Sequence, residues 1–286
     1  MKQHYLRGDL AGETPADKLY AWAAQVAQDA PEKDVYRNKE GRKTLRFTRA
    51  GKSYFLKLHS GIGWSEIVKN LLQLRLPVLG ASNEYEAVNK LRDLGVDTMS
   101  VAAYASEGVN PAAIHSLIVT DDLVDTISLE DYCADWARHK PTLPIRLGLI
   151  RKLADSARRM HGAGINHRDF YLCHFHLDPE SLPRVAAATA GIRCYLIDLH
   201  RAQIRGKTPR RWRVKDLAGL YFSAMDAGLS RRDLLRFMHH YCEGGLREAL
   251  GPQADLWRDV ARRAAKLYTR DHGASPPPLL GGMFGP

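Results

Sequence analysis

The sequence predicts an α+β fold with two lobes, a β-rich first part and a mainly helical second part. Segments with the two-residue alternation of strands lie before about residue 125, and the 3.6-residue period of helices dominates after about residue 140. The chain has 286 residues, of which 45% are hydrophobic, enough for a sizeable core in one large domain or two lobes. We expect lobes at 1–123 and 124–274, and a disordered proline- and glycine-rich tail at 275–286.

The first part contains strand and helix patterns in alternation. Thr44–Thr48 and Ser53–His59 read as two strands joined by the turn Ala50-Gly51-Lys52. A clear helix spans Asn83–Gly95, with an apolar stripe at Tyr85, Val88, Leu91 and Leu94, and Gly95 fits its C-cap. The remaining predicted elements are helices at Asp17–Ala27 and Ile67–Leu76 and strands at Val96–Ala105 and Ser116–Thr120.

The second part is predicted to be helical with one short β region. The predicted helices are Leu129–Arg138, Leu143–His161, Val214–Ala227, Arg231–Tyr241 and Ala254–Thr269. The β region comprises Phe175–Leu177 and Cys194–Ile197.

Charge and cysteine usage limit the classes of partner and compartment. The net charge of +10 and the pI near 9.5 favour nucleotides, nucleic acid, anionic lipid headgroups or acidic proteins. The four cysteines are widely spaced, with no Cys-x-x-Cys pair, so we expect reduced thiols in a cytosolic protein. Because no run of about 18 apolar residues exists and the first ten residues lack an apolar stretch, we expect neither a membrane-spanning helix nor a signal peptide.

Two acidic residues carry the strongest chemical signal. Asp169 ends the triplet His167-Arg168-Asp169, and Asp198 follows the apolar pair Leu196-Ile197. Phosphoryl transfer uses such a pair, because one carboxylate orients or deprotonates the attacking hydroxyl and the other holds the Mg²⁺ that bridges the ATP phosphates. A capping aspartate at a strand end is the alternative for Asp198.

His174 stands five residues after Asp169, where a kinase normally carries an asparagine as second metal ligand. An imidazole is a poor ligand for Mg²⁺, so His174 either contributes weakly to the metal site or donates a hydrogen bond to the phosphates.

Lys57 and Glu84 are the candidates for the cation that holds the ATP phosphates and for its carboxylate partner. Lys57 lies in the strand pattern between Leu56 and Leu58, and a solvent-facing lysine is the alternative. Glu84 and Glu86 cannot share a helix face, and Glu84 is in line with the apolar stripe, so we choose Glu84.

Weaker signals complete the predicted nucleotide site. Gly41 and Arg42 lie in the short basic loop Lys39–Thr44, a candidate phosphate cover or a plain surface hairpin, since the chain has no glycine-rich phosphate motif. Ser116–Leu123 reads as a strand running into a hinge that offers backbone hydrogen bonds to adenine, and we include Asp122 among the nucleotide-binding residues. On a predicted helix, Asp216 could brace the catalytic loop by accepting backbone N–H bonds.

Taken in order, these parts resemble the protein-kinase-like superfold over about residues 33–245. A closer resemblance, from about Asp34 to Tyr268, is to the lipopolysaccharide core heptose(I) kinase family. The segments that carry it are Tyr54–Leu72, Leu76–Ala81, Asn166–Phe175 and Ile197–Gln203. His174 in place of asparagine, and Leu199-His200 in place of Phe-Gly, depart from protein kinases and agree with this family.

The resemblance implies ATP- and Mg²⁺-dependent transfer to a hydroxyl of the first heptose of the inner core, at the cytoplasmic face of the inner membrane. By motif position, Asp169 is then the base, Asp198 the metal ligand and Lys57 the phosphate-binding lysine. The short stretch between Arg201 and Trp212 makes control through an activation loop doubtful.

Two further segments fit a lipid-linked, negatively charged acceptor. One is the basic run Arg201, Arg205, Lys207, Arg210, Arg211 and Arg213, which is either an acceptor or lipid contact or a solvated charged face. The other has Trp64, Ile67 and Leu71 at helical spacing, which suits a membrane interface, an acidic partner such as an acyl carrier protein, or packing on the small lobe.

Three alternatives stay open. The chain could be a small-molecule kinase of the aminoglycoside type or a protein kinase, since these would share Lys57, Asp169 and Asp198. It could instead be an inactive kinase fold that acts as a basic binding module. Nucleic-acid binding is not expected, because no basic-aromatic motif accompanies the high pI.

Overall fold

The computed structural model describes residues 3–12, 18–39, 41–72, 79–186 and 191–277, and the chain divides into two units. Unit 1 joins Met1–Lys90, Met99–Val124 and Leu199–Arg201, and unit 2 joins Leu91–Thr98, Asp125–Asp198 and Ala202–Pro286. Residues 278–286 of the expected tail lie outside the described residues.

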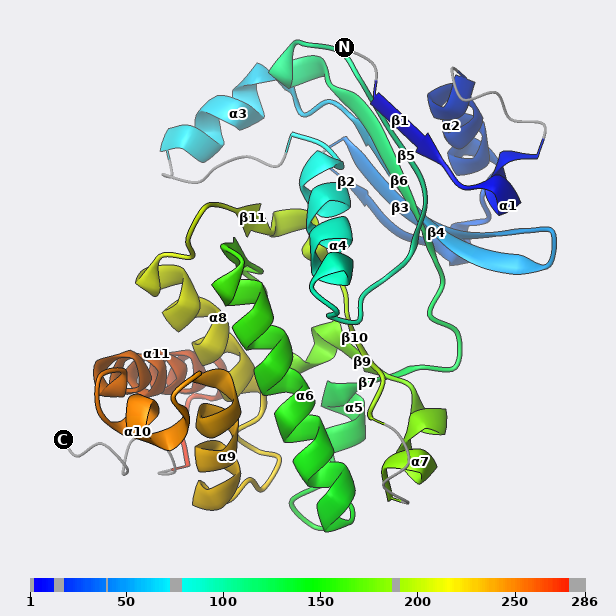
Figure 1. The fold of residues 1–286 in the computed structure, drawn as a ribbon. Helices are drawn as coiled ribbons and strands as arrows, with labels where there is room; N and C mark the ends of the chain where they lie inside the picture. The colour runs from blue at the N-terminus through cyan, green and yellow to red at the C-terminus, as the bar shows by residue number, and fades with distance from the viewer. Residues whose placement is uncertain (1–2, 13–17, 40, 73–78, 187–190, 278–286) are drawn as a thin grey trace. The chain divides into compact units, whose positions relative to one another are not determined.

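Unit 1 is built on an antiparallel six-stranded sheet with the order β1-β5-β6-β4-β3-β2 (Figure 1). Its strands are β1 (Gln3–Leu6), β2 (Val35–Lys39), β3 (Arg42–Arg49), β4 (Lys52–Ser60), β5 (Val101–Glu107) and β6 (His115–Asp121). With the helical second unit, this sheet confirms the predicted α+β class.

The two faces of this sheet differ because side chains alternate along each strand. On β4, Tyr54, Leu56 and Leu58 belong to a buried cluster with the helix α2 (Leu19–Asp29), whose own buried residues recur every four positions. Lys57 therefore points to the opposite face, where it meets the helix α4 (Ser82–Asp93). The predicted β3–β4 hairpin is confirmed.

The other helices of unit 1 are short. They are α1 (Gly8–Ala11) and α3 (Gly63–Leu72). Thus α3 begins four residues before the predicted helix, and the predicted residues 73–76 lie outside the described part of the chain.

The predicted strand Val96–Ala105 is wrong in its first half, since β5 begins only at Val101. Gly95 has a left-handed φ of 67° and ends α4, and Val96 donates its N–H to the carbonyl of Leu91. Thr98 then donates its hydroxyl to the carbonyl of Leu196 at 2.6 Å. The N–H of Val96 is therefore used by the end of α4, and it is not available for pairing with a neighbouring strand.

Unit 2 is mainly helical. Its helices are α5 (Leu129–Cys133), α6 (Leu143–Gly162), α7 (Leu182–Ala186), α8 (Arg210–Ser223), α9 (Arg231–Tyr241), α10 (Gly245–Leu250) and α11 (Ala254–His272) (Figure 1). Its strands are β7 (Ile127–Ser128), β8 (Ile165–Asn166), β9 (Phe175–Leu177), β10 (Cys194–Leu196) and β11 (Gln203–Ile204). They form the sheets β10-β9-β7 and β11-β8.

Two predicted helices of unit 2 have wrong bounds. The Ser128 hydroxyl caps α5 at the expected start, but the helix ends at Cys133 and the chain continues in turns to residue 138. α8 begins four residues before the predicted Val214, directly after Pro209, and it ends at Ser223, four residues before the predicted Ala227. Its first residues are basic and show no apolar period, which explains why hydropathy missed this turn.

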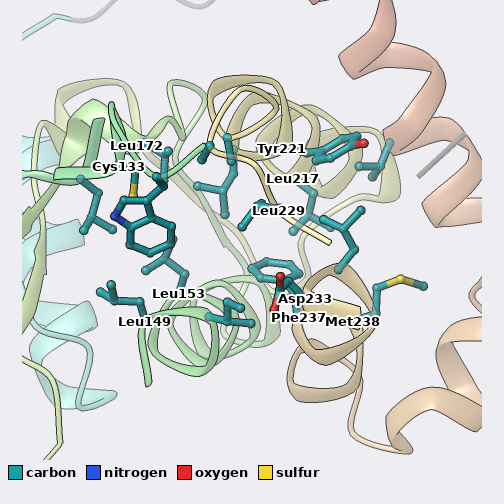
Figure 2. Close-up of a pocket in the computed structure, with 18 of the residues that line it drawn as sticks. Cys133, Leu149, Leu153, Leu172, Leu217, Tyr221, Leu229, Asp233, Phe237 and Met238 are labelled. Atoms are coloured by element: carbon teal, nitrogen blue, oxygen red, sulfur yellow. The ribbon is translucent and has the colours of Figure 1, made fainter. Parts of the chain in front are cut away.

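The helices of unit 2 enclose an apolar cavity of about 100 Å³. Figure 2 shows labelled side chains from α5, α6, α8 and α9 around it, among them Cys133, Leu153, Leu217 and Phe237. Asp233 is the charged residue in the lining, and its carboxylate is bound by the Ser230 cap. No helix in the described part of the chain is long and apolar enough to cross a membrane.

Candidate active site

The loop that carries Asp169 is held by the buried carboxylate of Asp216 on α8. Asp216 accepts the backbone N–H of His167 at 2.7 Å and that of Arg168 at 2.8 Å. These two bonds fix a turn in which Arg168 has a left-handed φ of 78°, a costly conformation for a non-glycine residue. The brace expected at Asp216 is therefore present, and it directs the chain into Asp169.

His167 connects this loop to the strand that precedes Asp198. Its Nε2 lies 2.9 Å from the carbonyl oxygen of Ile197, and its Nδ1 lies 3.3 Å from the backbone N–H of Asp169. Because Nδ1 accepts from an N–H, the hydrogen-bond network assigns the proton to Nε2, which donates to Ile197. Burial lowers the pKa of His167, so the ring is neutral, as this arrangement requires.

Asp169, His174 and Asp198 are brought together within unit 2. His174 Nδ1 lies 2.6 Å from the carbonyl oxygen of Asp169, and its Nε2 lies 3.7 Å from Oδ2 of Asp198. Asp198 has a left-handed φ of 60°. Burial lowers the pKa of His174, but hydrogen bonds to Cys173 and to the Asp169 backbone, with the charge of Asp198, outweigh it and raise the pKa to about 9.

These residues fit a magnesium ion whose remaining ligands come from a substrate. Mg²⁺ is typically held by one or two carboxylates together with phosphate oxygens and waters, and the carboxylate of Asp198 is about 30% exposed. Within the described residues no group of three or more potential metal ligands occurs. The raised pKa favours the protonated ring of His174, which offers an N–H to an anionic oxygen. Ligation of the metal by His174 stays a prediction.

Within unit 1, Lys57 forms an ion pair with Glu84. Lys57 Nζ lies 2.5 Å from Oε1 of Glu84, whose side chain is fully buried. Glu86 is exposed, so the apolar stripe of α4 identified the correct glutamate. A buried carboxylate of this kind fixes the direction of the lysine.

The basic segment Lys39–Thr44 joins two paired strands, as expected for the surface hairpin that was one of its two alternatives. Lys39 ends β2 and Arg42 begins β3, and Gly41 has a left-handed φ of 68°. A side chain at Gly41 would meet the carbonyl oxygen of Gly61 at 2.3 Å, so the backbones approach closely there. Arg42 is opposite His59 in the ladder, and therefore lies on the sheet face of Lys57.

Asp122 is engaged within unit 1. Its backbone N–H donates to the carbonyl of Ser53, and its carboxylate accepts the Ser53 hydroxyl at 2.8 Å. The N–H of Asp122 is thus occupied in this structure, which leaves the adenine contact assigned to this residue as a prediction.

Two buried histidines, His59 in unit 1 and His161 in unit 2, were not among the predicted site residues. His59 is buried two residues after Lys57, and burial, followed by the charges of Arg42 and Lys57, lowers its pKa to about 3. The two-residue strand period from Lys57 could have identified it. His161 lies 3.3 Å from Asp216 and 3.0 Å from the hydroxyl of Tyr241, and no sequence signal marks this contact between distant helices.

Comparison with known proteins identifies the family. The model of the lipopolysaccharide kinase (Kdo/WaaP) family matches residues 26–241, about three quarters of the chain. The chain belongs to the lipopolysaccharide kinase (Kdo/WaaP) family.

Two curated members of the family are close relatives. The lipopolysaccharide core heptose(I) kinase WaaP of Escherichia coli is 50% identical over 237 residues, covering 83% of this chain and 88% of the relative. The protein of the same name from Pseudomonas aeruginosa is 48% identical over 244 residues, covering 85% and 90%.

A solved structure described as WaaP in complex with acyl carrier protein is also similar. It matches with a TM-score of 0.75 and 39% sequence identity, over 93% of this chain and 99% of the solved chain. The mixed architecture of this chain is therefore that of a kinase-like family member.

The Lys57–Glu84 pair predicts an asymmetry between two neighbouring glutamates. Glu84→Gln should raise the KM for ATP about tenfold, because removing a buried charge partner releases the lysine. Lys57→Ala should have a larger effect. Steady-state kinetics with varied ATP measure both, with the exposed Glu86→Gln as matched control. If Glu86→Gln raised the KM for ATP more than Glu84→Gln does, the pairing of Lys57 with Glu84 would be contradicted.

Proposed function

We propose that the chain is a kinase that uses ATP and Mg²⁺ to phosphorylate a hydroxyl of the first heptose of the lipopolysaccharide inner core. The observation that carries the proposal is the convergence of Asp169, His174 and Asp198 on one loop pair in a member of this family. The names and the 48–50% identity of the curated relatives support this acceptor over an aminoglycoside or a protein. An inactive binding module would not need these acidic residues.

Each polar group of the site has a role in this reaction. Asp169 accepts the proton of the attacking heptose hydroxyl and orients that oxygen. Asp198 would hold Mg²⁺, which supplies charge neutralisation at the phosphates when bound. His174 presents an Nε2–H beside Asp198 to a phosphate oxygen, and neutral His167 keeps the two loops in register. For Lys57, which is directed by Glu84 within unit 1, we propose the binding of an ATP phosphate.

The proposal predicts that both aspartates are essential. Asp198→Asn and Asp169→Ala should each lower kcat by about a thousandfold or more, because metal binding and proton acceptance are lost separately. Transfer of labelled phosphate from ATP to a heptose-terminated core acceptor measures this, and circular dichroism checks the fold. Asp135→Asn, an exposed aspartate of unit 2, is the control.

Wild-type protein should leave an aminoglycoside and a generic peptide unphosphorylated under the same conditions. Undiminished transfer by Asp198→Asn or Asp169→Ala would remove that residue from the site. If the aminoglycoside or the peptide were labelled in preference to the core acceptor, the heptose would not be the acceptor.

We further propose an acylated acyl carrier protein as a partner, bound at unit 2. The apolar cavity offers a place for part of an acyl chain, and α9 and α11, which help to line it, carry exposed cations suited to an acidic protein. The exposed arginines and lysines of these two helices are Arg231, Arg232, Arg258, Arg262, Arg263, Lys266 and Arg270. The similar solved structure contains an acyl carrier protein, which supports the choice of partner.

Acylation of the carrier should then strengthen binding. The cavity of about 100 Å³ accommodates a few methylene groups, fewer than a full chain, without movement of the helices. Removing about four methylenes from water contributes about 3 kcal/mol, or about a hundredfold in Kd. Calorimetry with acylated and unacylated carrier measures the difference. Equal affinity of the two forms would exclude the cavity as the acyl site.

We also infer that the protein works at the cytoplasmic face of the inner membrane, with α3 in contact with the lipid surface. Trp64, Val68 and Leu72 recur every four residues on α3 and are 58%, 51% and 80% exposed, whereas Ile67 on another side is 6% exposed. An exposed apolar stripe that begins with tryptophan, in a strongly basic protein, suits an anionic lipid interface. A lipid-linked acceptor requires such a location.

The stripe predicts a specific loss of lipid binding. Trp64→Ala with Leu72→Ala should weaken sedimentation with phosphatidylglycerol vesicles by about tenfold, since less apolar area enters the interface. The double variant Val109→Ala with Val124→Ala removes apolar side chains that are equally exposed elsewhere in unit 1 and should bind as wild type does. The same loss in both double variants would contradict a role specific to α3.

A further inference from the structure

The indole of Trp212, in the first turn of α8, is surrounded by four cations. From the ring centroid, the guanidinium carbons of Arg168, Arg205 and Arg211 lie at 5.4, 5.9 and 5.4 Å, and Nζ of Lys215 lies at 5.6 Å. We call these five residues the Trp212 cluster. They all belong to unit 2.

The backbone around the catalytic loop positions the cluster. The strand β11 pairs with β8, which leads into Arg168, and the N–H of Arg205 donates to the carbonyl of Gly164 at 3.0 Å. Gly164 has a left-handed φ of 80°, and a side chain there would meet the carbonyl oxygen of Arg205 at 1.8 Å. Arg205 is therefore held against the loop by a close approach that only glycine permits.

The segment that contributes four of the five cluster residues is strongly basic. Residues 201–215 contain seven arginines and lysines and no acidic residue. The guanidinium of Arg205 donates to two neutral oxygens, Oδ1 of Asn166 at 2.6 Å and Oε1 of Gln203 at 2.5 Å. Cation–π contacts with the indole stabilise the cations around it.

Two buried donors next to these cations have no hydrogen-bond partner, which points to a missing acceptor. They are the indole Nε1 of Trp212 and the amide Nδ2 of Asn166, whose side chain is fully buried. Both are N–H groups, which require an acceptor. Cations and unpartnered N–H groups in one place are the complement of an oxyanion.

The cluster is accessible and adjoins the catalytic loop. Arg211 is exposed and Arg205, Trp212 and Lys215 are partly exposed, so a ligand can reach them from solvent. Arg168 directly precedes Asp169, and consecutive Cα atoms are about 3.8 Å apart. A group bound at the cluster is therefore on a molecule that can also reach the candidate base.

We propose that the Trp212 cluster binds an anionic group, a sugar carboxylate or a phosphate, of the lipopolysaccharide acceptor. Guanidinium groups bind both anions through paired hydrogen bonds. The inference rests on the proposed heptose kinase function and adds the part of the acceptor that is recognised. Buried, unpartnered donors favour one docked anion over a membrane surface, which exposed lysines and arginines attract without such donors.

Kinetics with a deacylated, heptose-terminated core oligosaccharide test this without lipid. For Arg211→Gln with Lys215→Gln, the KM for the oligosaccharide should rise about tenfold while kcat and the KM for ATP stay within about twofold. Trp212→Phe should shift the KM in the same direction, because it keeps a ring and removes the indole N–H. Arg138→Gln with Arg151→Gln, two exposed arginines of unit 2, removes the same charge and should behave as wild type does.

Modified acceptors identify the anion. Wild-type protein should lose affinity for either the carboxyl-reduced or the dephosphorylated oligosaccharide, and the double glutamine variant should no longer distinguish that acceptor from the intact one. The proposal would be overturned if the KM for the oligosaccharide were unchanged in the double glutamine variant or rose equally in the arginine control. A change only in the KM for ATP, or a loss only of vesicle or carrier-protein binding, would also overturn it.

If wild-type protein transfers no phosphate to this oligosaccharide, the proposed function fails, and calorimetric binding of the same oligosaccharide then decides the inference separately. Binding by the wild type that is weakened in the double glutamine variant supports the cluster. Equal binding by both, or no binding by either, overturns it.

Discussion

The carboxylate of Asp216 is the constraint on which the chemistry of unit 2 depends. It accepts two consecutive backbone N–H groups, those of His167 and Arg168, and thereby holds a left-handed residue immediately before Asp169. Without these bonds the turn would have buried N–H groups without partners, which costs about 1–3 kcal/mol each. His161 Nε2 lies 3.3 Å from Oδ2 of the same carboxylate, so helices far apart in the sequence set the position of the loop that carries Asp169.

The same principle, a buried carboxylate that orders a functional group, operates in unit 1. Glu84 is fully buried and holds Lys57, as Asp216 holds the catalytic loop. In unit 2, four cations surround the indole of Trp212. The net charge of +10 is thus partly concentrated at a defined site, which suits the proposed binding of anionic partners.

Sequence reasoning found the parts of the fold and site that local periodicity encodes. The alternation along β4 placed Lys57 opposite the core face, and the stripe of α4 distinguished Glu84 from Glu86. The helix α9 has the predicted bounds because its serine cap and apolar stripe agree. Asp216 was a candidate brace because it lies on a predicted helix with Leu217 and Leu220.

Contacts between segments far apart in the chain were not predicted from the sequence. The edge strands β1 and β2 are mostly exposed and lack an apolar face, so periodicity did not reveal them. The raised pKa of His174 depends on neighbours from two loops, and the Trp212 cluster on a close approach at Gly164. The sequence showed that the segment 201–215 is rich in arginine and lysine, but it did not show that these side chains gather around Trp212.

The most direct test of the account is the transfer rate of Asp216→Asn at saturating ATP and acceptor. An asparagine amide cannot accept both N–H groups, and a loss of about 2 kcal/mol in ordering Asp169 corresponds to about a thirtyfold lower kcat. The account predicts this decrease in a folded protein whose KM for ATP stays within about twofold. A wild-type kcat would contradict it, because the catalytic loop would then not depend on the carboxylate that holds it.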